Sequence, residues 1–366
     1  MTAGIAVEAL RLTLGAFRLD TVDFALSGGE ILVILGPNGA GKSVTLETVA
    51  GFHRPDSGRV LIGGRDVTAL APERRNIGFL VQNFGLFPHL NVEQNVALAR
   101  RGRRAGAADG KALPAQGDTA ALLAYFGVAA LARRLPADLS PGEKQRVALA
   151  RALAAAPEAF LFDEPFSALD AQTRAQLRDE LNSFLRELAI PAIFVTHDHT
   201  DALTLADKIV VLRDGVMLQS GPAAEVFQKP AGSSVARFVG VENILDGRIA
   251  AICGGIAAVD VGERTLRAPA PVQTDQTDKA VRLSIRAEDV TVCSSSGGDA
   301  AALDVNRLEG KIAGLRALGP LVTVEIDVGF ALKAYLLGPQ ARAMALGLGK
   351  PVAVEIAVNA IHVMTE

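Results

Sequence analysis

The fold is decided by the stretch Gly36-Pro37-Asn38-Gly39-Ala40-Gly41-Lys42-Ser43. The apolar run of residues 30–35 before it predicts a buried strand, and residues 44–50 after it predict a helix. A strand, a glycine loop and a helix in this order form the setting in which G-x-x-x-x-G-K-[ST] binds phosphate. The alternative is a glycine turn that only joins a strand to a helix.

The loop has the residue types that a nucleoside triphosphate site needs. Gly36, Gly39 and Gly41 have no Cβ, so backbone N–H groups can close around a phosphate chain. The start of the helix adds its positive dipole end. We expect Lys42 to reach the β- and γ-phosphates and the Ser43 hydroxyl to ligate Mg²⁺. The sequence therefore predicts that ATP and Mg²⁺ bind along the loop and its first helical residue, Val44.

Composition narrows the class of protein. The 366 residues are 49% hydrophobic and 21% charged, which indicates a globular chain of two or three domains. A net charge of −3 gives no reason to expect nucleic acid as a partner. Two cysteines, Cys253 and Cys293, cannot build a disulfide framework, so we expect a reducing cytoplasm. No signal peptide is recognised, and the longest charge-free apolar stretch, residues 119–132, is too short to cross a bilayer.

The order of apolar runs predicts an α/β fold. Residues 1–35 predict strands, and further buried strands are expected at 77–82, 160–162 and 192–195. Helical patterns cover 119–156, with an interruption at 136–141, and 172–188, whereas residues 100–118 predict a mobile, solvated insertion. Alternating strands and helices favour a mostly parallel sheet covered by helices.

Polar residues follow three of these strands and suggest a reaction. Asp163 and Glu164 follow an apolar strand; the first would hold Mg²⁺, and the second would polarise the attacking water. Gln82 can contact Mg²⁺ or water and sense the γ-phosphate, and His197 can donate a hydrogen bond to it. The alternatives are an acidic strand end in solvent and a structural histidine.

A second helix start lies at Leu139-Ser140-Pro141-Gly142-Glu143-Lys144-Gln145-Arg146. Ser140 is a suitable N-cap, Pro141 suits the first turn, and Glu143 stands three positions beyond the cap. We expect the helix to cover residues 145–155. A capped helix start is also a candidate anion site.

This stretch resembles the L-S-G-G-Q signature of ABC-type ATPases, and the other motifs match in family order over residues 1 to about 230. The matches are Gly36–Ser43 as Walker A, Gln82 as the Q-loop, residues 159–164 as Walker B, residues 167–170 with Asp170 as the D-loop, and His197 as the switch histidine. In the signature, Pro141 replaces a glycine and removes one backbone donor. Ser140 and Gly142, with Glu143 in place of the glutamine, would then recognise phosphate. Leu12 falls near the position of the adenine-stacking aromatic, and Phe17 is the nearest aromatic residue.

The resemblance implies a head-to-tail homodimer in which the signature of one copy closes on the ATP of the other. It also implies a transporter motor at the cytoplasmic face of the membrane, with two permease subunits and a solute-binding protein. In this family, the region of residues 82–90 lines a groove for a short helix of the membrane subunit. Phe84, Leu86 and Phe87 are apolar residues suited to that role, although they could instead pack inside.

The C-terminal part predicts an all-β domain of two small OB-like barrels. Residues 243–249 recur as 306–312, and residues 281–286 are echoed at 352–357. This tail resembles the regulatory domain of importer ATPases, and residues 306–364 most resemble a molybdate-binding-type barrel. Where that barrel offers polar donors, the chain has Leu303, Val305, Leu337, Gln340, Ala357 and Asn359. We therefore expect the fold to persist, the tail to pair with its partner's tail, and the anion pocket to be lost.

The sequence thus predicts a P-loop ABC-type ATPase domain at residues 1–235, with a helical subdomain at about 96–156, and a regulatory domain at 241–366. The expected activity is ATP hydrolysis coupled to import of a small solute. Molybdate or tungstate is the first choice, with sulfate, iron, polyamine or sugar behind it. A soluble ABC-type ATPase acting on DNA or ribosomes would be expected to show two fused cassettes or a long coiled coil. A P-loop kinase would lack the signature.

Overall fold

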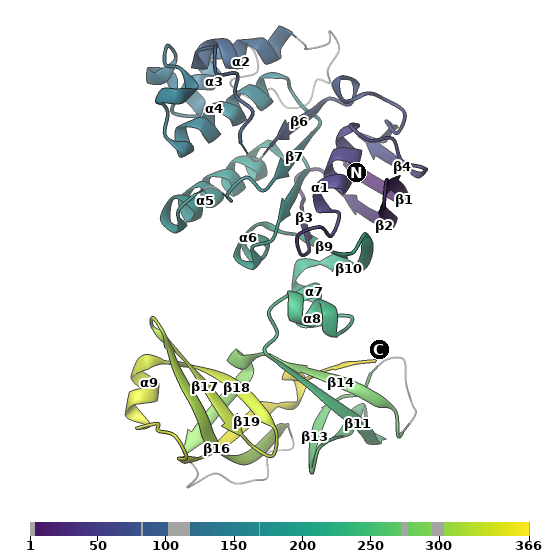
Figure 1. Ribbon diagram of the computed structural model, residues 1–366, viewed down its shortest axis with the longest axis vertical. Helices are drawn as coiled ribbons and strands as arrows, with labels where there is room; N and C mark the ends of the chain where they lie inside the picture. Colours follow the sequence, from purple (N-terminus) through teal and green to yellow (C-terminus); the bar gives the residue numbers. More distant parts are fainter. Residues whose placement is uncertain are drawn as a thin grey trace. The chain divides into compact units, whose positions relative to one another are not determined.

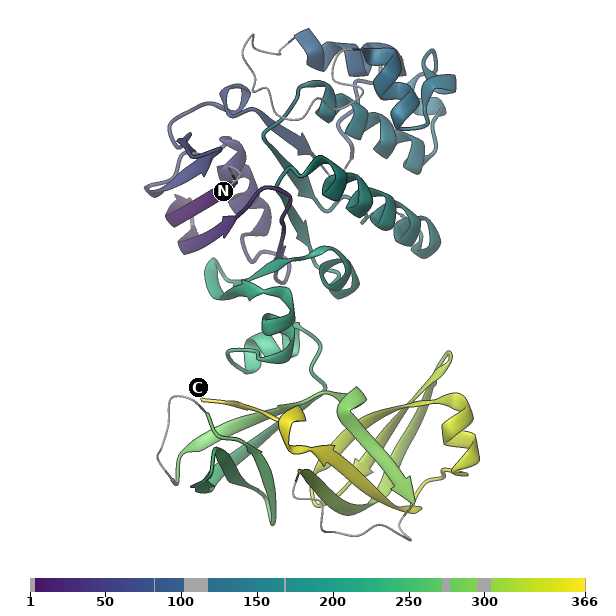
Figure 2. The ribbon, with the colours of Figure 1, turned by 180° about the vertical axis from the view of Figure 1, so that it is seen from behind.

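The computed structural model describes residues 4–81, 83–101, 118–167, 169–271, 277–294 and 304–365. The chain forms two compact units, Met1–Ala223 (unit 1) and Ala224–Glu366 (unit 2), both visible in Figures 1 and 2. Among the described residues, no helix is long and apolar enough to cross a membrane.

Unit 1 is built on a ten-stranded sheet in the order β5-β4-β1-β2-β10-β9-β3-β8-β7-β6. The strands are β1 (Ile5–Leu14), β2 (Phe17–Leu26), β3 (Ile31–Leu35), β4 (Ser57–Ile62), β5 (Arg65–Asp66), β6 (Ile77–Leu80), β7 (Ala159–Asp163), β8 (Ala192–Thr196), β9 (Lys208–Arg213) and β10 (Val216–Pro222). Strands β6, β7, β8, β3 and β9 pair in parallel. The remaining strands form a largely antiparallel wing. The expectation of a mostly parallel sheet is therefore correct for the central strands and wrong for the wing, where β1 and β2 form a hairpin.

The central strands carry the functional loops because their carboxyl ends are aligned. Strands β3 and β8 are buried along their whole length, as expected for apolar strands covered on both faces. Leu35 of β3 pairs with Thr196 of β8, and Asp163 of β7 pairs with Val195. Ligands of open α/β sheets bind at this edge of the sheet.

The helices of unit 1 are α1 (Lys42–Ala50), α2 (Val92–Arg101), α3 (Thr119–Tyr125), α4 (Pro141–Ala154), α5 (Ala171–Leu188) and α6 (His199–Leu205). Helices α2, α3 and α4 gather at one end of the unit (Figure 1). Several boundaries differ from the sequence expectation, and α1, for example, starts at Lys42 rather than at Val44. Helix α3 stops early because Gly127 adopts a positive φ of 66°, and α4 starts at Pro141 because Ser140 caps it. The expected insertion lies almost wholly outside the described residues.

Unit 2 contains two five-stranded sheets, in the orders β13-β12-β11-β14-β20 and β15-β19-β16-β17-β18. The strands are β11 (Asn243–Cys253), β12 (Ile256–Val261), β13 (Arg264–Pro269), β14 (Ala280–Ile285), β15 (Val290–Ser294), β16 (Val305–Leu318), β17 (Leu321–Asp327), β18 (Ala331–Leu337), β19 (Pro351–Ala357) and β20 (His362–Met364); the short helix α9 (Gly338–Ala343) follows β18. The two repeats exchange their last strands: β15 pairs with β19, and β20 pairs with β14. The predicted pair of OB-like barrels is confirmed, and this exchange joins them.

Two short helices precede the barrels of unit 2. They are α7 (Ala223–Gln228) and α8 (Ser233–Phe238). The Nη1 of Arg282 on β14 donates to the Ser233 hydroxyl at 2.9 Å, and the Nε2 of His362 on β20 lies 3.1 Å from the Pro230 carbonyl oxygen. These contacts hold the region of α7 and α8 against the first barrel, so residues 224–238 pack with unit 2.

Candidate nucleotide site

The phosphate loop joins β3 to α1 and leaves the start of α1 open. Gly39 and Gly41 adopt positive φ values of 81° and 99°, which a residue with a Cβ would rarely adopt. Gly41 is the N-cap of α1, and no side chain caps the helix there. The first N–H groups of the helix are therefore available to an anion.

Lys42 lies inside this loop. Its side chain is buried, and Nζ donates to the carbonyl oxygens of Gly36 at 2.9 Å and Pro37 at 3.0 Å. Burial lowers the pKa of Lys42, whereas the nearby carboxylates of Glu164 and Asp163 act in the opposite direction. The ammonium group thus occupies a place that phosphate oxygens could take over from the two carbonyls.

Two oxygen-bearing side chains that could ligate a metal ion lie at the end of the loop. The Ser43 hydroxyl donates to Oδ1 of Asp163 at 3.0 Å. Burial raises the pKa of Asp163, and the charge of Glu164 adds to this, whereas the bond from Ser43 lowers it. A hydroxyl and a carboxylate side by side are hard oxygen ligands of the kind that Mg²⁺ prefers. Gln82, the third expected ligand, lies outside the described residues.

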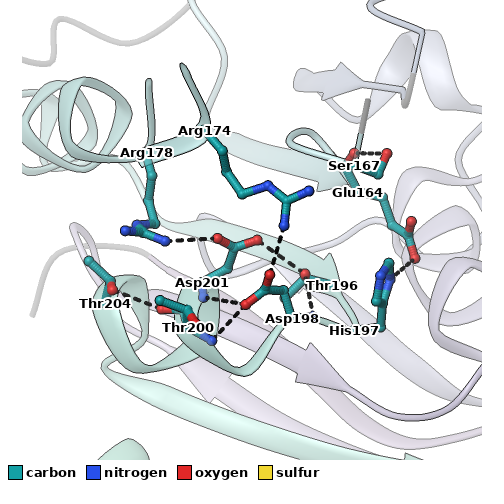
Figure 3. A network of polar contacts seen from close by, with 10 residues as sticks. All are labelled: Glu164, Ser167, Arg174, Arg178, Thr196, His197, Asp198, Thr200, Asp201 and Thr204. Atoms are coloured by element: carbon teal, nitrogen blue, oxygen red, sulfur yellow. Dashed lines mark hydrogen bonds and ion pairs between the residues drawn. The ribbon is translucent and has the colours of Figure 1, made fainter. Parts of the chain in front are cut away.

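Glu164 and His197 meet at the same edge of the sheet, as Figure 3 shows. The Nδ1 of His197 lies 3.0 Å from Oε1 of Glu164. With the Nδ1–H donating to this carboxylate, Nε2 can donate to a phosphate only when the ring is protonated. Glu164 has a φ of 46°, a strained backbone that is commonly found at functional sites. Its backbone is held by bonds from Glu164 N to Val195 O at 3.0 Å and from the Ser167 hydroxyl to Glu164 O at 3.0 Å.

The expected cap of α4 is confirmed as a capping box. The Glu143 carboxylate accepts from the Ser140 N–H at 2.7 Å and from the Ser140 hydroxyl at 2.8 Å. These two bonds lower the pKa of Glu143. Asp170 caps α5 in a similar way, accepting from the N–H groups of Gln172 and Thr173. Within one chain, Ser140 and Glu143 therefore cap the start of α4, and Asp170 caps the start of α5.

The candidates for the adenine contact and for the permease groove differ in how deeply their side chains are buried. Leu12 is only 3% exposed and belongs to the core, so it is not available to a ligand. Phe17 is half-buried beside the phosphate loop, and a Cβ on Gly41 would lie 2.6 Å from its Cζ. Phe84 is 8% exposed, which favours the alternative that it packs inside, whereas Phe87 is 41% exposed.

Sequence reasoning missed a set of charged and polar residues on the elements next to His197. They are Arg174 and Arg178 on α5, Thr196 at the end of β8, and Asp198 and Asp201 at the start of α6 (Figure 3). The spacing of the two arginines places them one turn apart, on one face of a helix, and two carboxylates follow His197 closely in sequence. That pairing of charges was the available signal.

Comparison with known proteins identifies relatives of this chain. A family model described as "ABC transporter" matches residues 19–167. The molybdate/tungstate import ATP-binding protein WtpC of Pyrococcus horikoshii is 35% identical over 360 residues, covering 98% of this chain and 99% of the relative. The Fe(3+) ions import ATP-binding protein FbpC of Agrobacterium fabrum is 34% identical over 296 residues, covering 80% of this chain and 81% of the relative.

A solved structure is similar to unit 1. It is the dimeric structure of a post-hydrolysis state of the ATP-binding cassette MJ0796 bound to ADP and Pi, with a TM-score of 0.50 and 28% identity. The match covers 60% of this chain and 98% of the chain in the solved structure.

The fold and the site define a nucleotide-binding P-loop ATPase with a helical subdomain and a C-terminal pair of barrels. The chain belongs to the ABC transporter family and, within it, to the ATP-binding proteins of importers, which couple ATP hydrolysis to transport. The predicted resemblance and activity are thereby confirmed.

Proposed function

We propose that the chain powers an importer of molybdate or tungstate. The observation that carries this proposal is that the match to the Pyrococcus horikoshii molybdate/tungstate protein extends over 98% of the chain, including both barrels. The Agrobacterium fabrum iron protein covers 80%. Iron is therefore the next alternative, followed by sulfate, polyamine and sugar. Work on DNA or ribosomes is set aside because the relatives reported above are import proteins.

The residues at the sheet edge divide the chemistry. ATP phosphates would lie on the N–H groups of residues 36–44, with Lys42 on the β- and γ-phosphates and Phe17 against the adenine. Mg²⁺, held by Ser43 and Asp163 with Gln82 alongside, would supply charge neutralisation at the phosphates. Glu164 polarises the attacking water, and protonated His197 donates from Nε2 to the γ-phosphate. Glu164 and His197 are already 3.0 Å apart, which supports this division of roles.

The active form would be a head-to-tail homodimer. The similar solved structure is dimeric, and this chain has one phosphate loop and one signature. Ser140 and the N–H of Gly142 would contact the partner's nucleotide, Glu143 would orient Ser140, and Asp170 would face the partner across the D-loop. Two permease subunits would bind near the exposed Phe87, on the cytoplasmic face of the membrane, and a solute-binding protein would complete the importer. We assign catalysis to residues 1–235, with a helical subdomain at about 96–156, and regulation to residues 241–366.

The proposal is tested by removing the gene and measuring the metal content of cells grown in nanomolar molybdate or tungstate. We expect cellular molybdenum and tungsten to fall, and to recover with the wild-type gene but not with Glu164→Gln. Cellular iron and growth on limiting sulfate are measured as controls. Unchanged molybdenum and tungsten, with a loss of iron or sulfate uptake, would reassign the solute.

A further inference from the structure

Arg174 on helix α5 contacts the segment that contains His197. The Nη1 of Arg174 donates to Oδ2 of Asp198 at 2.7 Å (Figure 3). Asp198 directly follows His197, and Arg174 lies in the first turns of the helix that Asp170 caps. The ion pair therefore links the start of α5 to the backbone next to the histidine.

Asp198 is held from several directions. Its Oδ1 accepts from the N–H groups of Thr200 at 2.7 Å and Asp201 at 3.3 Å, so that it caps α6. Its own N–H donates to the Thr196 hydroxyl at 3.0 Å. Burial acts to raise the pKa of Asp198, but these backbone bonds and the charge of Arg174 outweigh it and lower the pKa. Asp198 is thus a fixed anion, with one oxygen used by α6 and the other by Arg174.

Arg174 and Asp198 also line a small cavity. Its volume is about 10 Å³, and Glu164, Ser167, Arg174, His197 and Asp198 are among its lining residues. In the described part of the chain, the Nε of Arg174 is buried and has no hydrogen-bond partner. Buried N–H groups are normally paired, and a cavity of this size holds about one water molecule. A water bound to Nε would satisfy this N–H, and the cavity that Arg174 shares with Glu164 and His197 places its side chain next to both groups.

The same helix offers a comparison pair that lacks these features. Arg186 donates from Nη1 and Nη2 to the two oxygens of Asp207, at 2.6 and 3.0 Å. Both side chains are partly exposed, and neither lines the cavity. Arg186 thus joins α5 to an aspartate without taking part in the cavity, which makes it the matched control.

We propose that Arg174 is a positioning residue for ATP hydrolysis, acting through its ion pair with Asp198 to hold the neighbouring His197, and with it Glu164, in place, while one water pairs its buried Nε. This inference rests on the proposed roles of those two residues. Removal of Arg174 should therefore affect the chemical step and leave ATP binding at the phosphate loop intact, because no bond joins Arg174 to that loop among the described contacts.

The test uses the full chain with Arg174→Gln, Arg174→Lys, Asp198→Asn, the double variant Arg174→Gln/Asp198→Asn, and Arg186→Gln. Steady-state ATPase, equilibrium ATP binding and Tm are measured for each. We expect Arg174→Gln and Asp198→Asn each to lower kcat by about 10- to 100-fold, as displaced catalytic groups do. KM and ATP affinity should stay within about twofold of the wild-type values.

The variants are expected to act as one unit. The double variant should fall no further than the worse single variant, because both remove the same link. Arg174→Lys should recover part of kcat, since an ammonium can still pair with Asp198 but cannot also serve the water. Arg186→Gln should lower Tm about as much as Arg174→Gln does, with kcat unchanged.

Wild-type kcat in Arg174→Gln, or an equal loss of kcat in Arg186→Gln, would overturn the inference while leaving the proposed function standing. A wild-type chain that binds but never hydrolyses ATP would instead contradict the proposed function. If Arg174→Gln fails to fold, the comparison of Asp198→Asn with Arg186→Gln decides the question by the same criteria.

Discussion

Asn243 and Asn306 make the same contact in opposite directions between the two barrels of unit 2. Oδ1 of Asn243 accepts from the N–H of Lys333 at 2.6 Å, and its Nδ2 donates to the Lys333 carbonyl at 3.0 Å. Asn306 does the same with the N–H and carbonyl of Arg267, at 2.7 and 2.8 Å. Each amide pairs with an edge strand of the other barrel as a backbone neighbour would. The two asparagines and the exchanged strands thus join the barrels through their backbones.

The first prediction is that Asn306→Ala destabilises unit 2. Asn306 is 7% exposed, and the change leaves the N–H and carbonyl of Arg267 without their partner. An unpaired buried polar group costs about 1–3 kcal/mol, so the free energy of unfolding of unit 2 should fall by that amount. Its unfolding transition should therefore move to lower temperature. Calorimetry of the full chain with ADP would measure it. Asn359→Ala, at an exposed position, is the control and should change stability by less than about 0.5 kcal/mol. Equal effects would contradict the role of the contact.

The second prediction concerns Glu164. Glu164→Gln keeps the size of the side chain but removes the base, so hydrolysis should fall by about 10²–10⁴-fold while ATP still binds. The trapped nucleotide should hold the dimer closed, which size-exclusion chromatography with ATP would show as a stable dimer. Hydrolysis at the wild-type rate would exclude the assigned role.

The third prediction concerns the composite site. A Ser140→Arg chain and a Lys42→Ala chain should each be inactive alone. In a mixed head-to-tail dimer, one site has both defects and the other has neither. Mixing the two chains should therefore restore part of the ATPase activity. Mixed dimers that form without any recovery would count against the head-to-tail arrangement.

The order of the central elements could be predicted because their signals are local. The apolar runs of β3, β7 and β8, the glycine loop and the Ser140 cap each require only neighbouring residues. The antiparallel wing and the strand exchange could not be predicted, since pairing partners lie far apart in sequence. The pairing of β20 with β14, for example, joins Val363 to Leu283. Periodicity shows that a strand exists but not which strand lies beside it.

The candidate site divides in the same way. Asp163 and Glu164 stand at the end of an apolar strand, and Lys42 and Ser43 follow another one through the glycine loop. The contacts of Ser43 with Asp163 and of Glu164 with His197 follow from aligned strand ends. The burial of Phe84 and the link from Arg174 to Asp198 depend on tertiary packing. Charges at helical spacing on α5 could equally have faced solvent, so sequence alone did not distinguish Arg174 from a surface arginine.

The last prediction is that unit 2 binds molybdate weakly or not at all. A desolvated dianion needs several hydrogen-bond donors or charged groups around it. Val305 and Ala357 pair with each other on β16 and β19, and Leu337 ends β18 with an apolar side chain. Oε1 of Gln340 accepts from the Leu337 N–H at 3.2 Å, which ties this side chain to the start of α9, and its Nε2 offers an anion only an uncharged donor. Asn359 is exposed, and Leu303 lies outside the described residues.

Calorimetric titration of the full chain with molybdate would test this, with saturating ADP so that the phosphate loop is already filled. Sulfate is titrated in parallel as a control for general anion binding. We expect little or no heat from either anion. Molybdate binding at micromolar concentration or tighter, without matching sulfate binding, would overturn the loss of the pocket. The same result would strengthen molybdate as the imported solute, because a regulatory site for an anion is of use where that anion is transported.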